Sequence, residues 1–452
     1  MRRTKVLNYR ITHMRGSFKL KIVSAFLTAA IFALSACDRT PEFNFAPAFS
    51  YELADENIVM FYNESEGEYI WMTWDFGNGE TLTTLDKKQI IQTYYAQAGL
   101  YRISLKVSDA NGNSDTTSTT IEIPEDDLQV SFSAEFDESD PYLLNLSNTT
   151  TGNYDLARWK YRNRELENVK DLAAYLPFAG RYEIELVIEK NGYQFSSSKS
   201  ITISQDDPQY FNKLTLTWSD EFEGPDINSA NWTFETGATG WGNNELQNYT
   251  NGANAIIQDG ILVLTATKIN ENTQVGSYNS TRMITKNKEE FTYGRIEIRA
   301  KLPSGRGIWP AIWMLGSNIS QVDWPACGEI DIMEYVGYEP DVIHSTVHTP
   351  SGYNADGSGS SKTLTTAEEE FHVYGMLWTE RKIVFYTDSP SNVTHSYSPS
   401  VKTAENWPFN LPQFFILNIA VGGNWGGVQG IDNSIFPQSM EIDYLRVYQE
   451  PG

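Results

Sequence analysis

The stretch Gly328-Glu329-Ile330-Asp331-Ile332-Met333-Glu334 places three acids within six residues and surrounds them with large apolar side chains. A solvated run of charges would not be threaded with isoleucine and methionine, so the pattern indicates a largely buried strand. On a regular strand Glu329, Asp331 and Met333 share one face, and Glu334 points to the other. One extra residue, a β-bulge near Met333, would return Glu334 to the face of its partners. The stretch therefore predicts a bulged strand with three carboxyl groups on one face.

Two carboxyl groups on one strand suit the hydrolysis of a glycosidic bond. Four strand steps separate the Cα atoms of Glu329 and Glu334 by roughly 13 Å, and an inward lean of about 4 Å by each side chain would leave the carboxyls roughly 5 Å apart. Retaining glycosidases need about 5–5.5 Å, whereas inverting ones need a wider gap for water. Asp331 between them would raise the pKa of the acid or orient the nucleophile. Spacing alone leaves open which glutamate takes which role.

The next alternating stretch, residues 341–348, predicts a hairpin partner for this strand. Gly337-Tyr338-Glu339-Pro340 can turn the chain back, and antiparallel register would then bring His348 near Glu329. His344 would line the same face. We expect His348 in the site, and for His344 a structural role is favoured.

Three β-rich segments follow one another along the chain. Residues 99–107 alternate strictly between polar and apolar, and a turn at Asp109-Ala110-Asn111-Gly112 follows them. The segment 41–125 resembles a PKD-type immunoglobulin-like module, and 128–205 repeats its pattern in a degenerate form. Residues 212–450 contain several alternating strands and no long amphipathic helix. We therefore predict an all-β protein with two small sandwiches before a large one. A spacer role is favoured for the modules, with glycan binding as the alternative.

The N-terminus carries a targeting signal. Residues 22–36 form an apolar run behind basic residues, too short for a transmembrane helix. The run ends in Leu34-Ser35-Ala36-Cys37, which resembles the bacterial lipobox. This resemblance implies that residues 1–36 are a lipoprotein signal peptide and that Cys37 anchors the protein to a membrane, whereas an ordinary secretory signal is the alternative. We expect a monomeric lipoprotein of the outer membrane or cell surface, with Cys327 as a packed, unpaired thiol.

Charge and composition restrict the partners. The net charge of −24 opposes binding to nucleic acid and argues against a polyanionic substrate. The chain has 12 Trp and 25 Tyr, which suit surfaces that stack against sugar rings. A neutral polysaccharide is therefore the favoured partner.

The third segment resembles glycoside hydrolase family 16 along its whole length. The acidic strand matches the family's bulged E-x-D-x-x-E signature, and four other stretches match in order and spacing. They are Trp218–Phe222, Gly240–Thr250, Trp309–Leu315 and Gly422–Gly427. The resemblance implies a β-jelly-roll fold and a retaining hydrolase with Glu329 as nucleophile, Asp331 as its helper and Glu334 as general acid/base.

The resemblance also implies a substrate and a set of contacts. The stretches Asn243–Gln247 and Gly422–Trp425 are most similar to the laminarinase branch, which cleaves β-1,3-glucan within the chain. The positions that would bind sugar are Asn244, Arg282, Trp309, Trp313, Trp324, His348 and Trp425. Tryptophan faces cover pyranose rings, and Asn, Arg and His bond to hydroxyls.

Many family members carry a structural calcium ion. The matching ligands here would be the carboxylate of Asp443 and the carbonyl oxygens of Glu221 and Gly260, and oxygen donors suit this hard cation. Pairing of Asp443 with a basic side chain is the alternative. We expect catalysis itself to need no cofactor.

Two other functions stay open. One is hydrolysis of mixed-linkage β-glucan or a marine galactan by the same site, although a sulfated galactan would require more basic residues than the motif regions contain. The other is a non-catalytic, surface glycan-binding lipoprotein. The complete set of three acids favours an enzyme, because a pure binder has no need of them.

Overall fold

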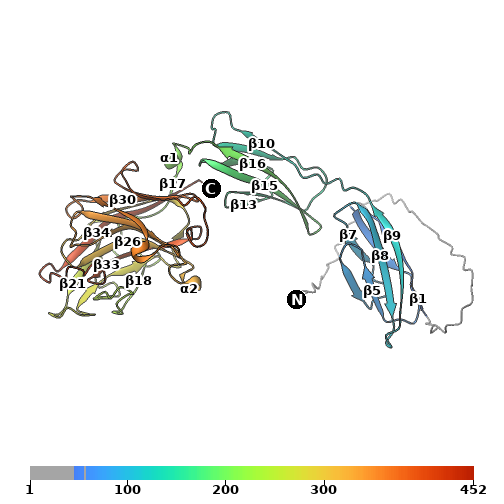
Figure 1. Cartoon of the computed structure of the whole chain (residues 1–452), viewed down its shortest axis with the longest axis horizontal. Coiled ribbons are helices and arrows are strands. Elements are labelled where there is room, and N and C mark those ends of the chain that lie inside the picture. The colour runs from blue at the N-terminus through green and yellow to red at the C-terminus, as the bar shows by residue number, and fades with distance from the viewer. Residues whose placement is uncertain (1–44, 55–56, 452) are drawn as a thin grey trace, which may run out of the picture. The chain divides into compact units, whose positions relative to one another are not determined.

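The structure is a computed structural model that describes residues 45–54 and 57–451. The predicted signal peptide and Cys37 lie outside the described residues. The chain divides into two compact units, Met1–Gln205 and Asp206–Gly452 (Figure 1). In the described part, no helix is long and apolar enough to cross a membrane.

The first unit begins with a small β-sandwich. One sheet contains β2 (Phe49–Leu53), β3 (Ile58–Asn63) and β7 (Ile91–Tyr94), and the other contains β6 (Thr81–Thr84), β5 (Trp71–Asp75), β8 (Gly99–Ser108) and β9 (Ser114–Ile123). A two-stranded sheet of β1 (Phe45–Ala46) and β4 (Glu66–Gly67) lies at its edge. Trp74 is fully buried between the sheets, opposite Leu105 of β8. The predicted alternating strand is thus β8, whose apolar residues fill the core.

The second sandwich repeats this arrangement. Its sheets contain β10 (Phe132–Phe136), β11 (Leu143–Asn148) and β14 (Asp171–Tyr175), and β13 (Arg164–Glu167), β12 (Leu156–Tyr161), β15 (Gly180–Lys190) and β16 (Tyr193–Ile203). Trp159 is fully buried opposite Leu186, as Trp74 is opposite Leu105. Tyr101 and Tyr182 each donate a hydroxyl hydrogen bond of 2.8 Å to the carbonyl four residues earlier. The two modules therefore share one architecture, although the first Gly-turn motif is lost from the second.

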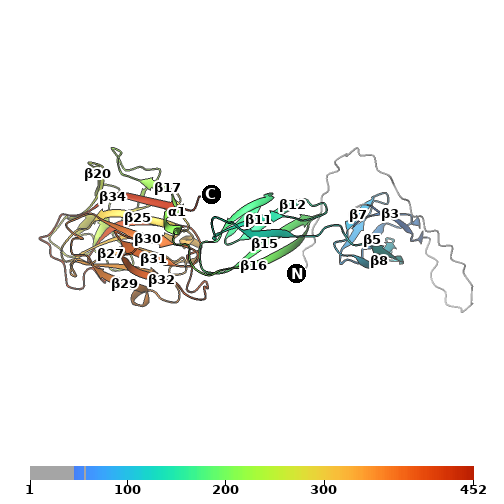
Figure 2. The ribbon, with the colours of Figure 1, turned by 90° about the horizontal axis from the view of Figure 1, so that it is seen from above.

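The second unit is a large sandwich of two sheets (Figures 1 and 2). The ten-stranded sheet contains, in spatial order, β19 (Gln247–Tyr249), β22 (Tyr278–Ser280), β21 (Ile261–Lys268), β34 (Gln438–Gln449), β25 (Gly294–Lys301), β30 (His372–Trp378), β31 (Ile383–Thr387) and β32 (Val393–Tyr397), with β17 (Thr215–Asp220) beside β34 and β20 (Ala255–Gln258) beside β21. The eight-stranded sheet contains β18 (Thr233–Phe234), β23 (Arg282–Ile284), β33 (Gln413–Val421), β26 (Ile308–Gly316), β27 (Glu329–Tyr335), β28 (Val342–His348) and β29 (Ser358–Thr363), with β24 (Glu290–Phe291) beside β33. The short helices are α1 (Tyr210–Lys213), α2 (Ile319–Val322) and the 3₁₀ turn η2 (Asn354–Asp356). The predicted all-β, jelly-roll class is confirmed.

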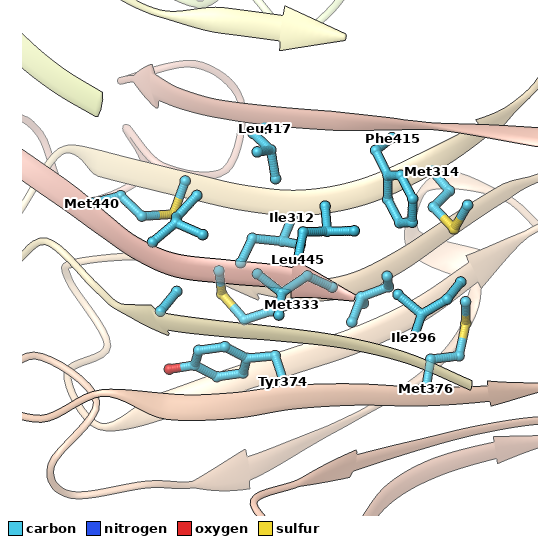
Figure 3. Close-up of a cluster of buried hydrophobic side chains, with 14 of the residues drawn as sticks. Ile296, Ile312, Met314, Met333, Tyr374, Met376, Phe415, Leu417, Met440 and Leu445 are labelled. Atoms are coloured by element: carbon cyan, nitrogen blue, oxygen red, sulfur yellow. The ribbon is translucent and has the colours of Figure 1, made fainter. Parts of the chain in front are cut away.

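The core lies between the two sheets (Figure 3). Ile312 and Met333 of the smaller sheet meet Ile296, Met376 and Leu445 of the larger one, and all five side chains are fully buried. One face of the smaller sheet is thereby committed to the core. Its other face is left for the polar side chains of the acidic strand.

Candidate active site

The acidic strand is β27, and it carries the predicted bulge. Asp331 pairs with Thr346 and Glu334 pairs with His344, so Ile332 and Met333 together lie opposite one residue of β28. Met333 turns into the core, where it is fully buried. The bulge therefore returns Glu334 to the face of the other two acids, as the sequence predicted.

The predicted hairpin brings His348 into the acid cluster. Glu329 pairs directly with His348 across β27 and β28. The His348 Nε2 atom lies 3.2 Å from Asp331 Oδ2 and 3.6 Å from Glu329 Oε1. Asp331 is only 3% exposed, and its Oδ2 has no hydrogen-bond partner among the described residues. The cluster therefore keeps a buried acceptor with no bonded donor.

Burial in this cluster favours the protonated form of the acids. It is the largest cause that raises the pKa of Glu329, followed by the negative charge of Asp331, whereas His348 opposes the rise. Burial also raises the pKa of Asp331. Burial and then the charge of Asp331 raise the pKa of Glu334 to about 8, although a hydrogen bond from Trp309 lowers it. Three neighbouring carboxyl groups cannot all be ionised here, so the site retains protons at neutral pH.

Two tryptophans donate to the outer acids. Trp309 Nε1 donates to Glu334 Oε1 at 3.1 Å, and the Trp324 indole donates to Glu329, which lowers the pKa of that carboxyl. Trp324 also makes an edge contact with His348, with ring centroids 6.1 Å apart. Each glutamate is thus held by its own indole from a neighbouring segment.

Trp313 on β26 and Arg282 on β23 lie on the side of β27 opposite to β28 and His348. Trp313 pairs with Asp331 across β26 and β27. The guanidinium of Arg282 lies over the rings of Trp241 and Trp313, at 5.0 and 4.8 Å from their centroids. Its Nε atom donates to Glu235 at 2.6 Å. The arginine is therefore held by two aromatic rings and a carboxylate, and it can present further N–H groups to a ligand.

Trp425 closes the Glu334 end of the site. Its ring makes edge contacts with Trp309 at 5.6 Å and His344 at 4.9 Å. Asn424, the residue before Trp425, accepts a 2.9 Å hydrogen bond at Oδ1 from Nδ2 of Asn244, which lies far away in the sequence. The structure thus links Asn244 to this end through Asn424, while His344 contacts the aromatic wall and lies 3.5 Å from Glu339.

Several neighbours of the site were not singled out from the sequence. Tyr353 is 43% exposed and makes an edge contact with Trp324 at 5.3 Å. Asn418 accepts a 2.7 Å hydrogen bond from Trp313 Nε1. Asn418 could have been found, because it interrupts the apolar run Phe414–Val421. Tyr353 lies in a loop without periodicity, so only its folded position identifies it.

Cys327 lies two residues before Glu329 as a free, fully buried thiol. Burial, followed by the charge of Glu329, raises its pKa to about 11. A thiol in this state is not nucleophilic at neutral pH.

The implied calcium ligands gather on β34, in the larger sheet. Asp220 pairs with Leu445, and Leu262 pairs with Ile442, so the segments with Glu221 and Gly260 meet along one edge of β34, opposite the edge that pairs with β25. The donor chemistry therefore fits a hard cation. However, Asp443 Oδ2 lies 2.5 Å from Arg299 Nη1, so a cation would have to share this carboxylate with the guanidinium.

Comparison with known proteins agrees with the fold. Residues 242–446 match glycosyl hydrolases family 16, and residues 46–122 match the PKD domain. A β-glucanase of Rhodothermus marinus is 43% identical over 247 residues, covering 52% of this chain and 85% of that protein. A glucan endo-1,3-β-glucosidase of Cryptopygus antarcticus is 37% identical over 250 residues, covering 51% and 90%. The X-ray structure of the laminarinase from Rhodothermus marinus has a TM-score of 0.50 and 41% identity, covering 53% of this chain and 98% of that one.

Proposed function

The chain belongs to glycosyl hydrolases family 16, and we propose that it is a retaining endo-hydrolase of β-1,3-glucan with Glu329 as nucleophile and Glu334 as general acid/base. The observation that carries this proposal is the bulge in β27, which gathers Glu329, Asp331 and Glu334 on one face. Without the bulge the two glutamates would lie on opposite faces of the sheet.

The surroundings of Glu334 support its role as the acid. A pKa of about 8 keeps Glu334 protonated at neutral pH, as a general acid requires. Since Trp309 Nε1 donates to Oε1, the acidic proton belongs on Oε2. For Glu329, burial and then the charge of Asp331 raise the pKa, whereas the nearby His348 and the Trp324 indole favour the carboxylate and oppose this rise. A proton held by Asp331 would remove its negative charge and so one of the causes that disfavour the Glu329 carboxylate.

The reaction then takes two steps. The Glu329 carboxylate attacks the anomeric carbon while the bond to the leaving oxygen breaks, and Glu334 gives its proton to that oxygen. In the second step Glu334 takes a proton from water, the water oxygen bonds to the anomeric carbon, and the Glu329 ester breaks. Two inversions return the original anomeric configuration.

A neutral glucan fits the surroundings of the acids. Trp309 and Trp425 offer ring surface at the Glu334 end, and Trp324 offers it at the Glu329 end, so we assign all three to sugar binding. Arg282 and Trp313 extend the surface across β26, and His348 and Asn244 offer polar contacts. The names of the similar proteins, a glucan endo-1,3-β-glucosidase and a laminarinase, support β-1,3-glucan as the substrate.

Product analysis on laminarin tests the proposal. We expect oligosaccharides of several lengths at early times, as internal cleavage requires, with the β-anomer released first in NMR spectra. An α-anomer released first would overturn the retaining mechanism. Greater activity on barley glucan or agarose would support the alternative substrates, and equal product release by wild type and Glu329→Gln would exclude the nucleophile assignment.

We also propose a lipid anchor at Cys37 on the outer membrane or cell surface, with the PKD-like modules as spacers and the protein as a monomer. The lipobox-like stretch Leu34–Cys37 is the observation that supports this anchor. In cells fed a radiolabelled fatty acid, wild type should be labelled and Cys37→Ser should not. Label retained by Cys37→Ser would exclude the anchor.

A further inference from the structure

A chain of hydrogen bonds leads from the candidate site to a buried carboxyl group. Trp313 Nε1 donates to Asn418 Oδ1 at 2.7 Å, and Asn418 Nδ2 donates to the Tyr249 hydroxyl at 3.0 Å. The Tyr249 hydroxyl donates to Glu245 Oε2 at 3.3 Å. Every donor in this chain points toward Glu245.

The residues of this hydrogen-bond chain are shielded from water. Glu245 is 5% exposed, Tyr249 1% and Asn418 6%. Glu245 also accepts hydrogen bonds from Gln247 Nε2 at 2.6 Å and from Asn243 Nδ2 at 3.2 Å. Burial raises the pKa of Glu245, while these donors and the charge of Arg282 favour its carboxylate. The carboxyl group is thus held as an acceptor on both of its oxygens.

The chemistry of the groups gives the chain a single direction. An indole N–H only donates, so Asn418 must turn its carbonyl oxygen to Trp313 and its amide nitrogen to Tyr249. The Tyr249 oxygen then accepts from Asn418, and its proton needs an acceptor elsewhere. An ionised carboxylate only accepts, which makes Glu245 the natural end of the chain. A donor at this end would leave the Tyr249 proton without its acceptor and weaken the hold of the hydrogen-bond chain on Asn418 and Trp313.

The other end of the chain lies beside the acids. Asn418 pairs with Ala311, which in turn pairs with Glu334 on β27. Trp313 pairs with Asp331 and lies under the Arg282 guanidinium. The tilt of the Trp313 indole therefore shapes the surface one strand away from the acids.

We propose that Glu245 is a positioning residue that anchors the end of this hydrogen-bond chain and thereby holds the Trp313 indole in its orientation for sugar binding. The sugar-binding part rests on the proposed function, whereas the orientation of the indole does not depend on it. Glu245 itself touches no substrate in this proposal, because Tyr249 and Asn418 stand between it and Trp313.

Glu245→Gln tests this anchor, because it keeps the shape of the side chain and replaces one acceptor oxygen by a donor. The control is Glu297→Gln in the larger sheet, where Glu297 Oε1 likewise accepts a tyrosine hydroxyl, that of Tyr386 at 2.9 Å. The first measurement is the ¹H–¹⁵N spectrum of the full chain, in which Trp313→Phe assigns the indole signal. We expect Glu245→Gln to move the Trp313 Nε1–H signal and Glu297→Gln to leave it in place.

Kinetics on laminarin give the second measurement. Loss of one buried hydrogen bond of about 1 kcal/mol should raise KM about fivefold while kcat stays within about twofold, since the acids are unchanged. Tyr249→Phe cuts the same chain at its middle and should reproduce both effects if Glu245→Gln does not fold.

An unmoved Trp313 signal in folded Glu245→Gln and Tyr249→Phe would overturn the proposal. A fall in kcat at constant KM would overturn its sugar-binding part. If wild type does not cleave laminarin, the proposed function fails, but the spectrum still decides whether Glu245 orients the indole.

Discussion

Trp309→Phe isolates the hydrogen bond that holds the proposed acid. The indole N–H lies 3.1 Å from Glu334 Oε1, and phenylalanine keeps a ring at this position without the donor. A hydrogen bond to a charged group contributes about 1.5–3 kcal/mol. We take the lower value, because Trp309 and Glu334 are both partly exposed.

The direction of the effect follows from the charge states. Trp309 stabilises the ionised form of Glu334 and lowers its pKa, so loss of the bond raises that pKa. A free energy of about 1.4 kcal/mol corresponds to a tenfold change in the ionisation constant. The alkaline limb of kcat/KM, where the general acid loses its proton, should therefore move up by about one pH unit.

The assay is the pH dependence of kcat/KM on laminarin, measured across both the acid and the alkaline limb. Each variant is normalised to its own maximum. Trp425→Phe is the control, since Trp425 packs against Trp309 but the hydrogen bond to Glu334 comes from Trp309. Its alkaline limb should stay with that of wild type, although both variants lose sugar contacts. An alkaline limb that stays in place or moves down in Trp309→Phe would refute the assignment of Glu334 as the acid that Trp309 controls.

Three further predictions concern the acids and the larger sheet. Glu329→Gln should lower kcat on laminarin by at least about 10³-fold while the variant stays folded, and activity near that of wild type would exclude it as nucleophile. Because the folded pKa of Glu334, about 8, exceeds the ordinary 4.5, its contribution to stability is present at acidic pH and is lost as the pH rises from about 4.5 to 8. Glu334→Gln should therefore melt at a higher temperature than wild type at pH 8, with a smaller difference at pH 5, and a difference that is constant with pH would contradict this. If calcium binds at Asp443, millimolar Ca²⁺ should raise the melting temperature of wild type and not that of Asp443→Asn, and melting curves that coincide with and without a chelator would exclude the site.

The local pattern of the acidic strand predicted much of the site. Alternation placed Glu334 on the opposite face, and that conflict itself required a bulge, which the structure has at Ile332 and Met333. The turn at 337–340 then determined the register that brings His348 to Glu329. Such contacts are predictable because neighbouring strands joined by a short turn leave few possible registers.

The partners of these residues come from distant parts of the chain. Asn418 meets Tyr249 across 169 positions, and Arg282 meets Glu235 across 47. No local periodicity encodes such pairs, since they depend on the order of strands in the sheet. Asp443 is a further example, because its ion pair with Arg299 appears only where β25 lies beside β34.

Side-chain alternation over a few residues was enough to predict the all-β class, the bulged acidic strand and the histidine beside it. The folded arrangement was needed to identify which indole donates to each glutamate and where the hydrogen-bond chain from Trp313 to Glu245 ends. Hydrogen-bond direction and burial depend on groups that sheet packing brings together from distant parts of the sequence. The spacing of three acids thus predicts where the chemistry lies, and the fold decides how protons and rings are arranged around it.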